Sequence, residues 1–291
     1  MQEHPPLLPL TIQQLHYLAT VAEQPTWAAA ATELGVSPSA LSQGLAELER
    51  RIGVTLFTRS GRRRELAPGA DEVVAYAQRV IAQTRELGQW AASVRSGSAG
   101  RLRVGMIDAA AVEHFPGALA AFRAERPDVD LRLTVAPSGT LLEQLRAAEL
   151  DVAVVVDPPP PSDDLELSPL IEEDLALYAP AGAAVGDAPS WGPFVLFPED
   201  SHTRRTIVAA LHERGATVDV VAVSHQPEVL RTMVELGLGW TVLPVAQAES
   251  GPSPLRRAIK EPLGRRRLVA ARRRGSITQP ATQALIAALA T

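Results

Sequence analysis

The stretch from Pro38 to Arg50 constrains the fold of this chain more than any other. Ser37 stands before it and can cap a helix, because a serine hydroxyl accepts hydrogen bonds from backbone N–H groups of the first turn. Proline suits the first helical position, where no N–H donor is needed. Apolar residues then recur with helical spacing, which predicts an amphipathic helix, at Leu41, Leu45, Leu48 and Ile52.

The opposite face of this helix carries Ser39, Gln43 and Arg50. Short side chains let a helix approach base edges closely, and glutamine can form two hydrogen bonds with adenine in the major groove. Two interpretations follow from these residues alone: a helix that enters the major groove of DNA, or an ordinary amphipathic surface helix.

The residues before Pro38 favour the first interpretation. Residues 12–22 have helical apolar spacing, and Pro25 ends that helix because proline cannot continue the hydrogen-bond ladder. Thr26 can cap a second helix, which a short turn with a glycine, residues 35–37, connects to the third. Two helices joined in this way, the second with a polar outer face, predict a helix-turn-helix.

Arginines gather in the hairpin predicted after these helices. Residues 54–57 form its first strand, residues 60–62 its turn and residues 64–66 its return, and the basic side chains are Arg59, Arg62, Arg63 and Arg64. An arginine cluster is often only a solvated surface, but beside a helix-turn-helix it suits backbone phosphates. The net charge is −5, yet a local basic patch suffices for phosphate contact.

A long helix is predicted for residues 68–96. Its apolar and small residues step by four and three positions, as in a heptad seam, at Val73, Ala77, Val80, Thr84, Leu87, Ala91 and Val94. Such a seam implies a partner helix, and the alternative is a helix that packs on its own C-terminal domain. Residues 96–100 then form a flexible hinge.

Residues 101–291 alternate between strand and helix patterns, which predicts parallel α/β sheets in two units with a ligand cleft between them. The predicted helices span residues 112–125, 140–150, 203–214, 227–236 and 280–290. The predicted strands begin at Leu102 and continue with residues 129–135, 151–156, 175–179, 194–197, 218–223, 240–243, 255–259 and 267–271.

Candidate ligand-binding residues stand where strands end and helices begin. Three helix N-termini converging on one cleft suit an anion, and Arg204 could pair with a carboxylate. Each residue has an alternative role, since serine and threonine often only cap helices, histidines are often surface residues, and Asp108 would repel an acidic ligand. The candidates are Asp108, Ala109, Ser138, Gly139, Thr140, Ser201, His202, Thr203, Arg204, Ser224 and His225.

The motif pattern excludes several kinds of catalysis. The chain has no cysteine, no zinc-binding histidine spacing, no nucleophile elbow and no phosphate-binding loop. We therefore predict no catalytic residue, no metal site and no cofactor. The N-terminus lacks a signal-peptide pattern, and no apolar run approaches the ~18 residues of a membrane span, so we expect a cytoplasmic protein without membrane contact.

The N-terminal residues resemble the winged helix-turn-helix of the LysR-type transcriptional regulators. The matching motifs are Leu15-x-Tyr17-Leu18-x-x-Val21-Ala22-Glu23, Ala30-Ala31-x-x-Leu34-x-Val36-Ser37-x-Ser39-Ala40-Leu41-Ser42, Leu45-x-x-Leu48-Glu49-x-x-Ile52-Gly53-x-x-Leu56-Phe57-x-Arg59 and Leu66-Ala67-Pro68-Gly69. The resemblance implies DNA contacts by Ser37, Pro38, Ser39, Ser42 and Gln43, with Arg59 and the wing arginines on phosphates. Gly44 departs from the family pattern, which has a larger residue there, and Trp27 replaces a commoner phenylalanine.

The C-terminal half resembles the effector-binding domain of the same family, which is built like a periplasmic binding protein. The matching motifs are Phe115-Pro116-x-x-Leu119-x-x-Phe122, Leu150-Asp151-Val152-Ala153-Val154, Val234-x-x-Gly237-x-Gly239 and Leu243-Pro244. The segment between Tyr178 and Phe194 is shorter than in the family and lacks its His-Pro pair.

The predicted protein is a multidomain α/β transcriptional regulator. Its predicted parts are a winged helix-turn-helix (11–67), a dimerisation helix (68–96) and an effector domain (101–291) with subdomain I at about 101–163 and 264–291 and subdomain II at about 164–263. The expected partners are double-stranded operator DNA, a small-molecule effector with carboxylates among the candidates, further copies in a homodimer or homotetramer, and RNA polymerase. The rival interpretations are an enzyme or solute-binding protein on the same fold, and an architectural DNA-binding protein with a vestigial sensor.

Overall fold

A computed structural model describes residues 8–60, 63–96, 100–250, 253–277 and 279–290. The chain divides into two compact units, with the boundary at residues 92 and 93. Each unit is described by itself. Among the described residues, none of the helices is both long enough and apolar enough to span a membrane.

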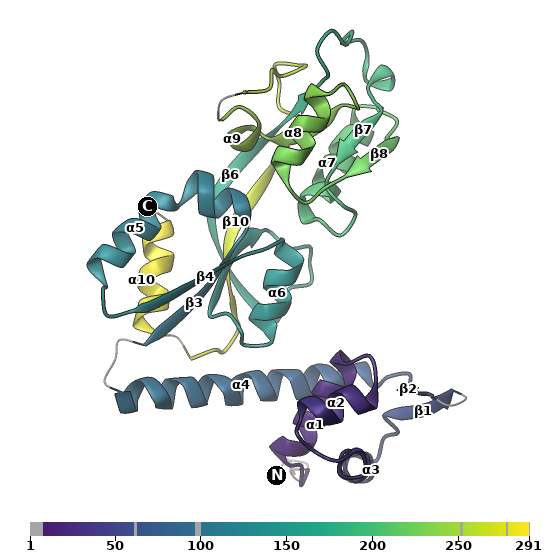
Figure 1. Cartoon of the computed structure of the whole chain (residues 1–291), viewed down its shortest axis with the longest axis vertical. Helices are drawn as coiled ribbons and strands as arrows, with labels where there is room; N and C mark the ends of the chain where they lie inside the picture. The colour runs from purple at the N-terminus through teal and green to yellow at the C-terminus, as the bar shows by residue number, and fades with distance from the viewer. Residues whose placement is uncertain (1–7, 61–62, 97–99, 251–252, 278, 291) are drawn as a thin grey trace, which may run out of the picture. The chain divides into compact units, whose positions relative to one another are not determined.

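The first unit is a helical domain with a small hairpin (Figure 1). A capping box opens its first helix, because Thr11 and Gln14 each accept a hydrogen bond from the other's backbone N–H. The apolar faces of the first three helices share one core that includes Leu18, Leu41 and Leu45. The elements are α1 (Ile12–Glu23), α2 (Trp27–Glu33), α3 (Pro38–Ile52), β1 (Phe57–Ser60), β2 (Arg63–Leu66) and α4 (Asp71–Ser96).

Helix α4 has two different halves. In the first half, Val73, Ala77 and Val80 of the predicted seam pack against the core of this same unit. Further along, Thr84 is exposed and Leu87 has an exposed fraction of 54%. The side chain of Val94 lies outside the described residues. The seam therefore serves the core at its start and stays uncovered in the single chain around Leu87.

The second unit is an α/β domain in two lobes. Lobe I contains β3 (Arg101–Met106), α5 (Pro116–Glu125), β4 (Asp130–Val135), α6 (Ser138–Arg146), β5 (Val152–Val156) and α10 (Pro280–Leu289). Lobe II contains β7 (Phe194–Leu196), α7 (His202–Glu213), β8 (Val220–Val223), α8 (Pro227–Glu235), β9 (Thr241–Pro244) and α9 (Val245–Ala248). Two long strands cross between the lobes, β6 (Leu165–Tyr178) and β10 (Gly264–Arg273) (Figure 1).

The crossing strands link the lobes into one mixed sheet of order β4-β3-β5-β10-β6-β9, beside a two-stranded parallel sheet of β7 and β8. Strands β3, β4 and β5 are parallel to one another, as the strand–helix alternation predicts. Strand β10 is antiparallel to both β5 and β6, because it carries the chain back from lobe II to lobe I. The expectation of purely parallel sheets is therefore wrong for the strands that cross.

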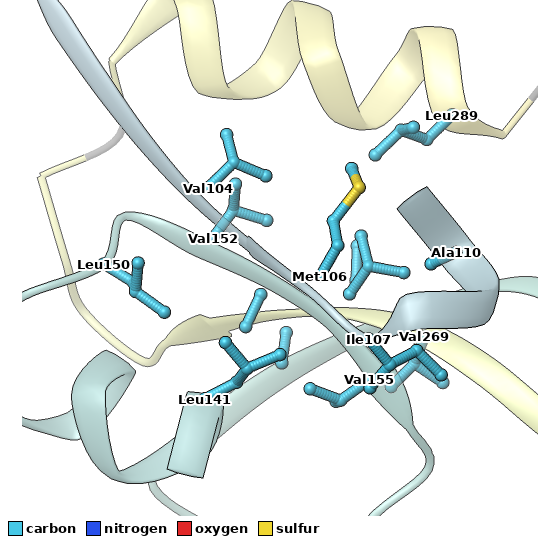
Figure 2. Close-up of a cluster of buried hydrophobic side chains, with 14 of the residues drawn as sticks. Val104, Met106, Ile107, Ala110, Leu141, Leu150, Val152, Val155, Val269 and Leu289 are labelled. Atoms are coloured by element: carbon cyan, nitrogen blue, oxygen red, sulfur yellow. The ribbon is translucent and has the colours of Figure 1, made fainter. Parts of the chain in front are cut away.

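Each lobe has its own hydrophobic core. In lobe I, side chains cover both faces of the sheet, with Leu289 of α10 on one side and Leu141 of α6 on the other (Figure 2). Strand β5 is buried at all five positions, which explains its continuous apolar sequence.

Three predicted elements differ in the structure. The helix expected at residues 112–125 is a short π-helical turn (Ala110–His114) followed by α5, because Pro116 starts a new helix and cannot donate to the old one. The strand expected at residues 255–259 is only an isolated bridge at Arg257, in a segment with prolines on both sides. The first wing strand begins at Phe57 rather than Val54.

Candidate functional site

The N-terminus of α3 has the geometry that its sequence predicts. The Oγ atom of Ser37 accepts a hydrogen bond from the backbone N of Ala40 at 3.1 Å, and Pro38 occupies the first turn. Ser39 and its neighbour in the cap, Ser37, are joined by a 2.9 Å hydroxyl contact. Both serines, Pro38 and Gln43 are exposed, so this end of α3 presents short polar groups to solvent.

The opposite face of α3 is fixed in the core by Leu41, Leu45 and Leu48, each almost fully buried. Gly44 lies at the contact with α1. A Cβ atom at this position would stand 2.8 Å from two ring carbons of Tyr17, so the helix approaches the ring through its glycine. The departure of Gly44 from the family pattern thus has a packing reason. Trp27 belongs to the same core and meets Phe57 edge-on at 4.8 Å between ring centroids.

Arg50 is exposed but is held by a neighbour on its own helix. Its Nε donates to Glu47 Oε2 at 2.7 Å, and Arg51 Nε donates to Glu47 Oε1 at 2.6 Å. These two guanidinium hydrogen bonds lower the pKa of Glu47 to about 2. A phosphate contact by Arg50 would therefore replace a carboxylate partner rather than fill an empty position. Ser42, by contrast, is half-buried.

The wing is attached to α3 by a carboxylate. Glu49 Oε1 accepts hydrogen bonds from the backbone N of Leu56 at 2.7 Å and of Phe57 at 3.1 Å. The two wing strands then pair antiparallel from Phe57–Leu66 to Ser60–Arg63. The side chains of Arg59, Arg63 and Arg64, and all of Arg62, lie outside the described residues. The sequence prediction gave Glu49 no role, although its place one turn before the wing is a usable signal.

The second unit contains a cavity of about 410 Å³ between its lobes. Four segments line it: Ile107–Ala109 after β3, Val135–Thr140 at the start of α6, Asp200–Thr203 at the start of α7, and His225–Glu228 at the start of α8, together with Val156, Phe197, Gln247 and Arg266. The three helix N-termini expected at a cleft therefore do meet at one cavity, where their backbone N–H groups favour anionic groups.

Most predicted ligand-binding residues line this cavity, and two do not. Arg204 is 8% exposed and its Nη1 donates to the backbone oxygen of Phe197 at 2.6 Å. This burial lowers the pKa of Arg204. The Oγ of Ser224 accepts from the backbone N of Gln226 at 3.1 Å, and α8 begins only at Pro227. The prediction that Arg204 clamps a ligand carboxylate is thus wrong, because its side chain turns into lobe II.

Several polar side chains of the cavity already have structural partners. The Oγ of Ser138 accepts from the backbone N of Val156 at 3.2 Å, which joins α6 to β5. His202 Nδ1 lies 3.3 Å from the backbone oxygen of the same Val156, and this contact connects lobe II to lobe I. At the rim, His225 Nε2 lies 3.9 Å from Asp200 Oδ1.

Asp108 is the acidic group nearest the first strand. Its Oδ2 accepts a 3.1 Å hydrogen bond from Gln247 Nε2, so one side chain from each lobe meets here. Burial and the negative charge of Glu228 raise the pKa of Asp108, while the hydrogen bond from Gln247 lowers it. The carboxylate therefore sits in a negative environment that would favour a positively charged neighbour.

Arg266 on β10 is the cation of the cavity and is only 5% exposed. Its Nε donates to Glu173 Oε2 at 2.6 Å, its Nη1 to Thr203 Oγ1 at 2.9 Å and its Nη2 to Gln247 Oε1 at 3.5 Å. Glu173 also meets His114 Nε2. Burial raises the pKa of Glu173, but hydrogen bonds and charge from His114 and Arg266 outweigh it, so the pKa is lowered.

The sequence prediction missed Gln247, Arg266 and Glu228. For Arg266 a signal existed: the alternation of the strand puts it on the same face as Leu268 and Ala270, whereas Arg265 and Arg267 are exposed. Glu228 could have been found one residue after the predicted start of its helix. Gln247 gives no such signal, because α9 is a single short turn.

Two family models match the chain. Residues 12–70 match the model described as "Bacterial regulatory helix-turn-helix protein, lysR family", and residues 95–291 match the "LysR substrate binding domain". Together they cover both units of the structure.

Similar full-length proteins agree with the family models. The HTH-type transcriptional activator IlvY of Salmonella typhimurium is 27% identical over 86% of this chain and 88% of its own. A probable hydrogen peroxide-inducible genes activator of Mycobacterium avium is 31% identical over 80% of this chain and 78% of its own.

Solved structures share the fold. Full-length OxyR from Pseudomonas aeruginosa has a TM-score of 0.63 at 27% identity and covers 98% of this chain and 95% of its own. CbnR in complex with its target DNA has a TM-score of 0.61 at 21% identity, with coverages of 96% and 99%. The chain therefore belongs to the LysR family and is a DNA-binding transcriptional regulator with a C-terminal substrate-binding domain.

Proposed function

We propose that α3 reads operator DNA in the major groove while the wing holds the neighbouring backbone. The observation that carries this proposal is the exposed, polar first half of α3 opposite a fully buried leucine face. In this assignment Gln43 recognises a base edge, and the other contacts are made by Ser37, Pro38, Ser39, Ser42, Arg50, Arg59, Arg62, Arg63 and Arg64.

The proposed division of labour follows the chain order. Residues 11–67 bind DNA, residues 68–96 pair with the same helix of a second copy, and residues 101–291 bind the effector. The exposed Leu87 in the heptad seam supports pairing through α4. Paired copies would engage two half-sites of one operator, and a homotetramer would engage more. RNA polymerase is a candidate partner of the DNA-bound form.

The effector site we propose is the cavity between the lobes. Its volume of about 410 Å³ falls in the usual range for small-molecule sites, roughly 300–1,000 Å³. Hydrogen bonds from Gln247 to Asp108 and from Arg266 to Thr203 cross its wall, so a bound molecule would meet groups from both lobes. An effector acts on DNA binding only as far as it favours one arrangement of the lobes over another.

The absence of cysteine limits how this regulator can respond. One relative is named as a peroxide-inducible genes activator, but oxidation of a cysteine thiolate cannot operate in this chain. Reversible binding of a small molecule is the remaining mechanism that the cavity supports. We assign the protein no enzymatic activity and place it in the cytoplasm, where its operator would be.

Binding of the full-length protein to the DNA upstream of its own gene tests the DNA assignment. Gln43→Ala should lose about 1–3 kcal/mol on the true site and relax specificity at one base pair. The matched control is Gln83→Ala, at an exposed glutamine of α4 outside the proposed reading face. Equal footprints and equal affinities for Gln43→Ala and the native protein would contradict the assignment of α3 to the major groove.

Salt dependence provides a second criterion. Contacts to phosphates release counterions, so affinity for any DNA sequence should fall steeply as salt rises. Arg63→Ala should weaken binding to all sequences and flatten this dependence. A loss restricted to a single sequence would contradict a phosphate role for the wing.

A further inference from the structure

The cavity between the lobes contains an unusual arrangement of charge. Asp108 and Arg266 both line it, but they do not pair with each other. The side-chain amide of Gln247 stands between them: its Nε2 donates to Asp108 Oδ2 at 3.1 Å and its Oε1 accepts from Arg266 Nη2 at 3.5 Å. An anion and a cation therefore face the same space while a neutral group separates them.

The negative side of the cavity lacks a counter-charge. Among the described side chains, Asp108 forms no ion pair, and Gln247 is its hydrogen-bond partner. Glu228, at the start of α8, adds a second negative charge close enough to disfavour ionisation of Asp108. Glu228 also complements the dipole of its own helix, which is an ordinary structural role. Asp108 has no such helix N-terminus of its own, so its charge is the one that a ligand would neutralise.

The positive side has donors to spare. A guanidinium carries five N–H hydrogens, and the described hydrogen bonds of Arg266 use three, toward Glu173, Thr203 and Gln247. Because Arg266 is bound to Thr203, its remaining donors lie beside the first turn of α7, whose backbone N–H groups also favour an anion. Arg266 is fixed by these partners and is thus preorganised for a carboxylate.

We propose that the effector is a small zwitterion of the α-amino-acid class, with its ammonium group on Asp108 and Glu228 and its carboxylate on Arg266 and the first turn of α7. This inference rests on the proposed function of the cavity as the effector site. It replaces the simple carboxylate expected from the sequence, because helix N-termini alone would accept any anion whereas Asp108 repels one without a positive group.

The test compares each ligand with analogues that lack one charge. The probes are the twenty common L-amino acids, their 2-hydroxy acids, which lack the ammonium group, and their decarboxylated amines. Binding to the full-length protein is followed by thermal shift and then by calorimetry. At least one amino acid should bind, and its two analogues should bind about ten- to a hundredfold more weakly, because each leaves a charged partner unsatisfied.

Two variants assign the ammonium contact. Asp108→Asn keeps the shape of the side chain but removes its charge, so the affinity for the amino acid should fall about tenfold or more while the weak binding of the 2-hydroxy acid is retained or improved. Asp219→Asn removes an exposed carboxylate of lobe II outside the cavity and should change neither affinity. DNA binding by the ligand-free variants serves as the check on folding.

The possible results separate this inference from the function on which it rests. If the 2-hydroxy acids bind as tightly as the amino acids, or if Asp108→Asn weakens both equally, the cavity is an effector site but the zwitterion assignment is wrong. If none of the three ligand sets binds, the zwitterion assignment is also wrong. Operator binding by the same preparations tests the regulator function independently of either result.

Discussion

Replacing Gly44 by alanine should weaken the DNA-binding unit even though alanine is the better helix former. A Cβ atom at this position would lie 2.8 Å from Cδ2 and Cε2 of Tyr17, whereas carbon atoms pack at about 3.5–4.0 Å. Overpacking of this kind costs about 1–3 kcal/mol. The gain in helix propensity returns about 1 kcal/mol. The expected net result is a destabilisation of up to about 2 kcal/mol.

Hydrogen–deuterium exchange of the full-length protein can measure this effect locally, from the opening free energies of the slowest amides in α3. Gly88→Ala is the matched control, since Gly88 also lies within a helix and a Cβ there would meet nothing within 4 Å. It should stabilise α4 by up to about 1 kcal/mol. In a Tyr17→Leu background, which removes the ring, the penalty of Gly44→Ala should disappear. If Gly44→Ala stabilises its helix as Gly88→Ala does, the packing argument is refuted.

Two further changes have defined outcomes. Glu173→Gln should cost about 3–5 kcal/mol of stability in urea unfolding, because it leaves Arg266 charged and buried without its anion. The pKa of Glu173 is lowered from its ordinary 4.5 in the folded state, so its stabilisation is complete above pH 4.5 and is lost as the pH falls through the lowered folded value. The difference between native protein and variant should shrink over that acidic range, and a pH-independent difference would argue against the ion pair. Leu87→Arg should place a charge in the exposed part of the α4 seam, so sedimentation should show smaller assemblies than for Gln83→Arg, an exposed position outside the seam; equal sedimentation of the two would argue against pairing through Leu87.

The recognition helix was predictable because its determinants are local. The cap at Ser37, the proline after it and the leucine spacing all act within one or two helical turns. The reason for Gly44 was not predictable in this way, because Tyr17 belongs to a different helix and their approach is a tertiary contact. Sequence spacing identified an anomaly there, and packing explains it.

The cavity shows the same division. Ser138, Ser201 and Thr203 were found because strand ends and helix starts follow from local pattern, and an α/β fold brings such points together. Arg204 was misjudged because being at a helix start does not determine the direction of a side chain. Gln247 and Arg266 were missed because they come from a short turn and from a strand late in the chain. Their importance lies in contacts with Asp108, Glu173 and Thr203 that no local pattern encodes.

The pairing of β6 with β10 determines which motions the effector unit can make cheaply. The two strands connect the lobes and are hydrogen-bonded to each other from Gly264–Leu175 to Arg273–Leu165. Sliding one strand along the other would break many of these bonds, each worth about 0.5–1.5 kcal/mol, whereas twisting the ribbon follows the natural deformation of a sheet. The bulge between Leu268 and Val269 is a local point of bending. The connection therefore acts as a torsion bar: a molecule bound between the lobes would be reported as an angle of rotation rather than as a separation.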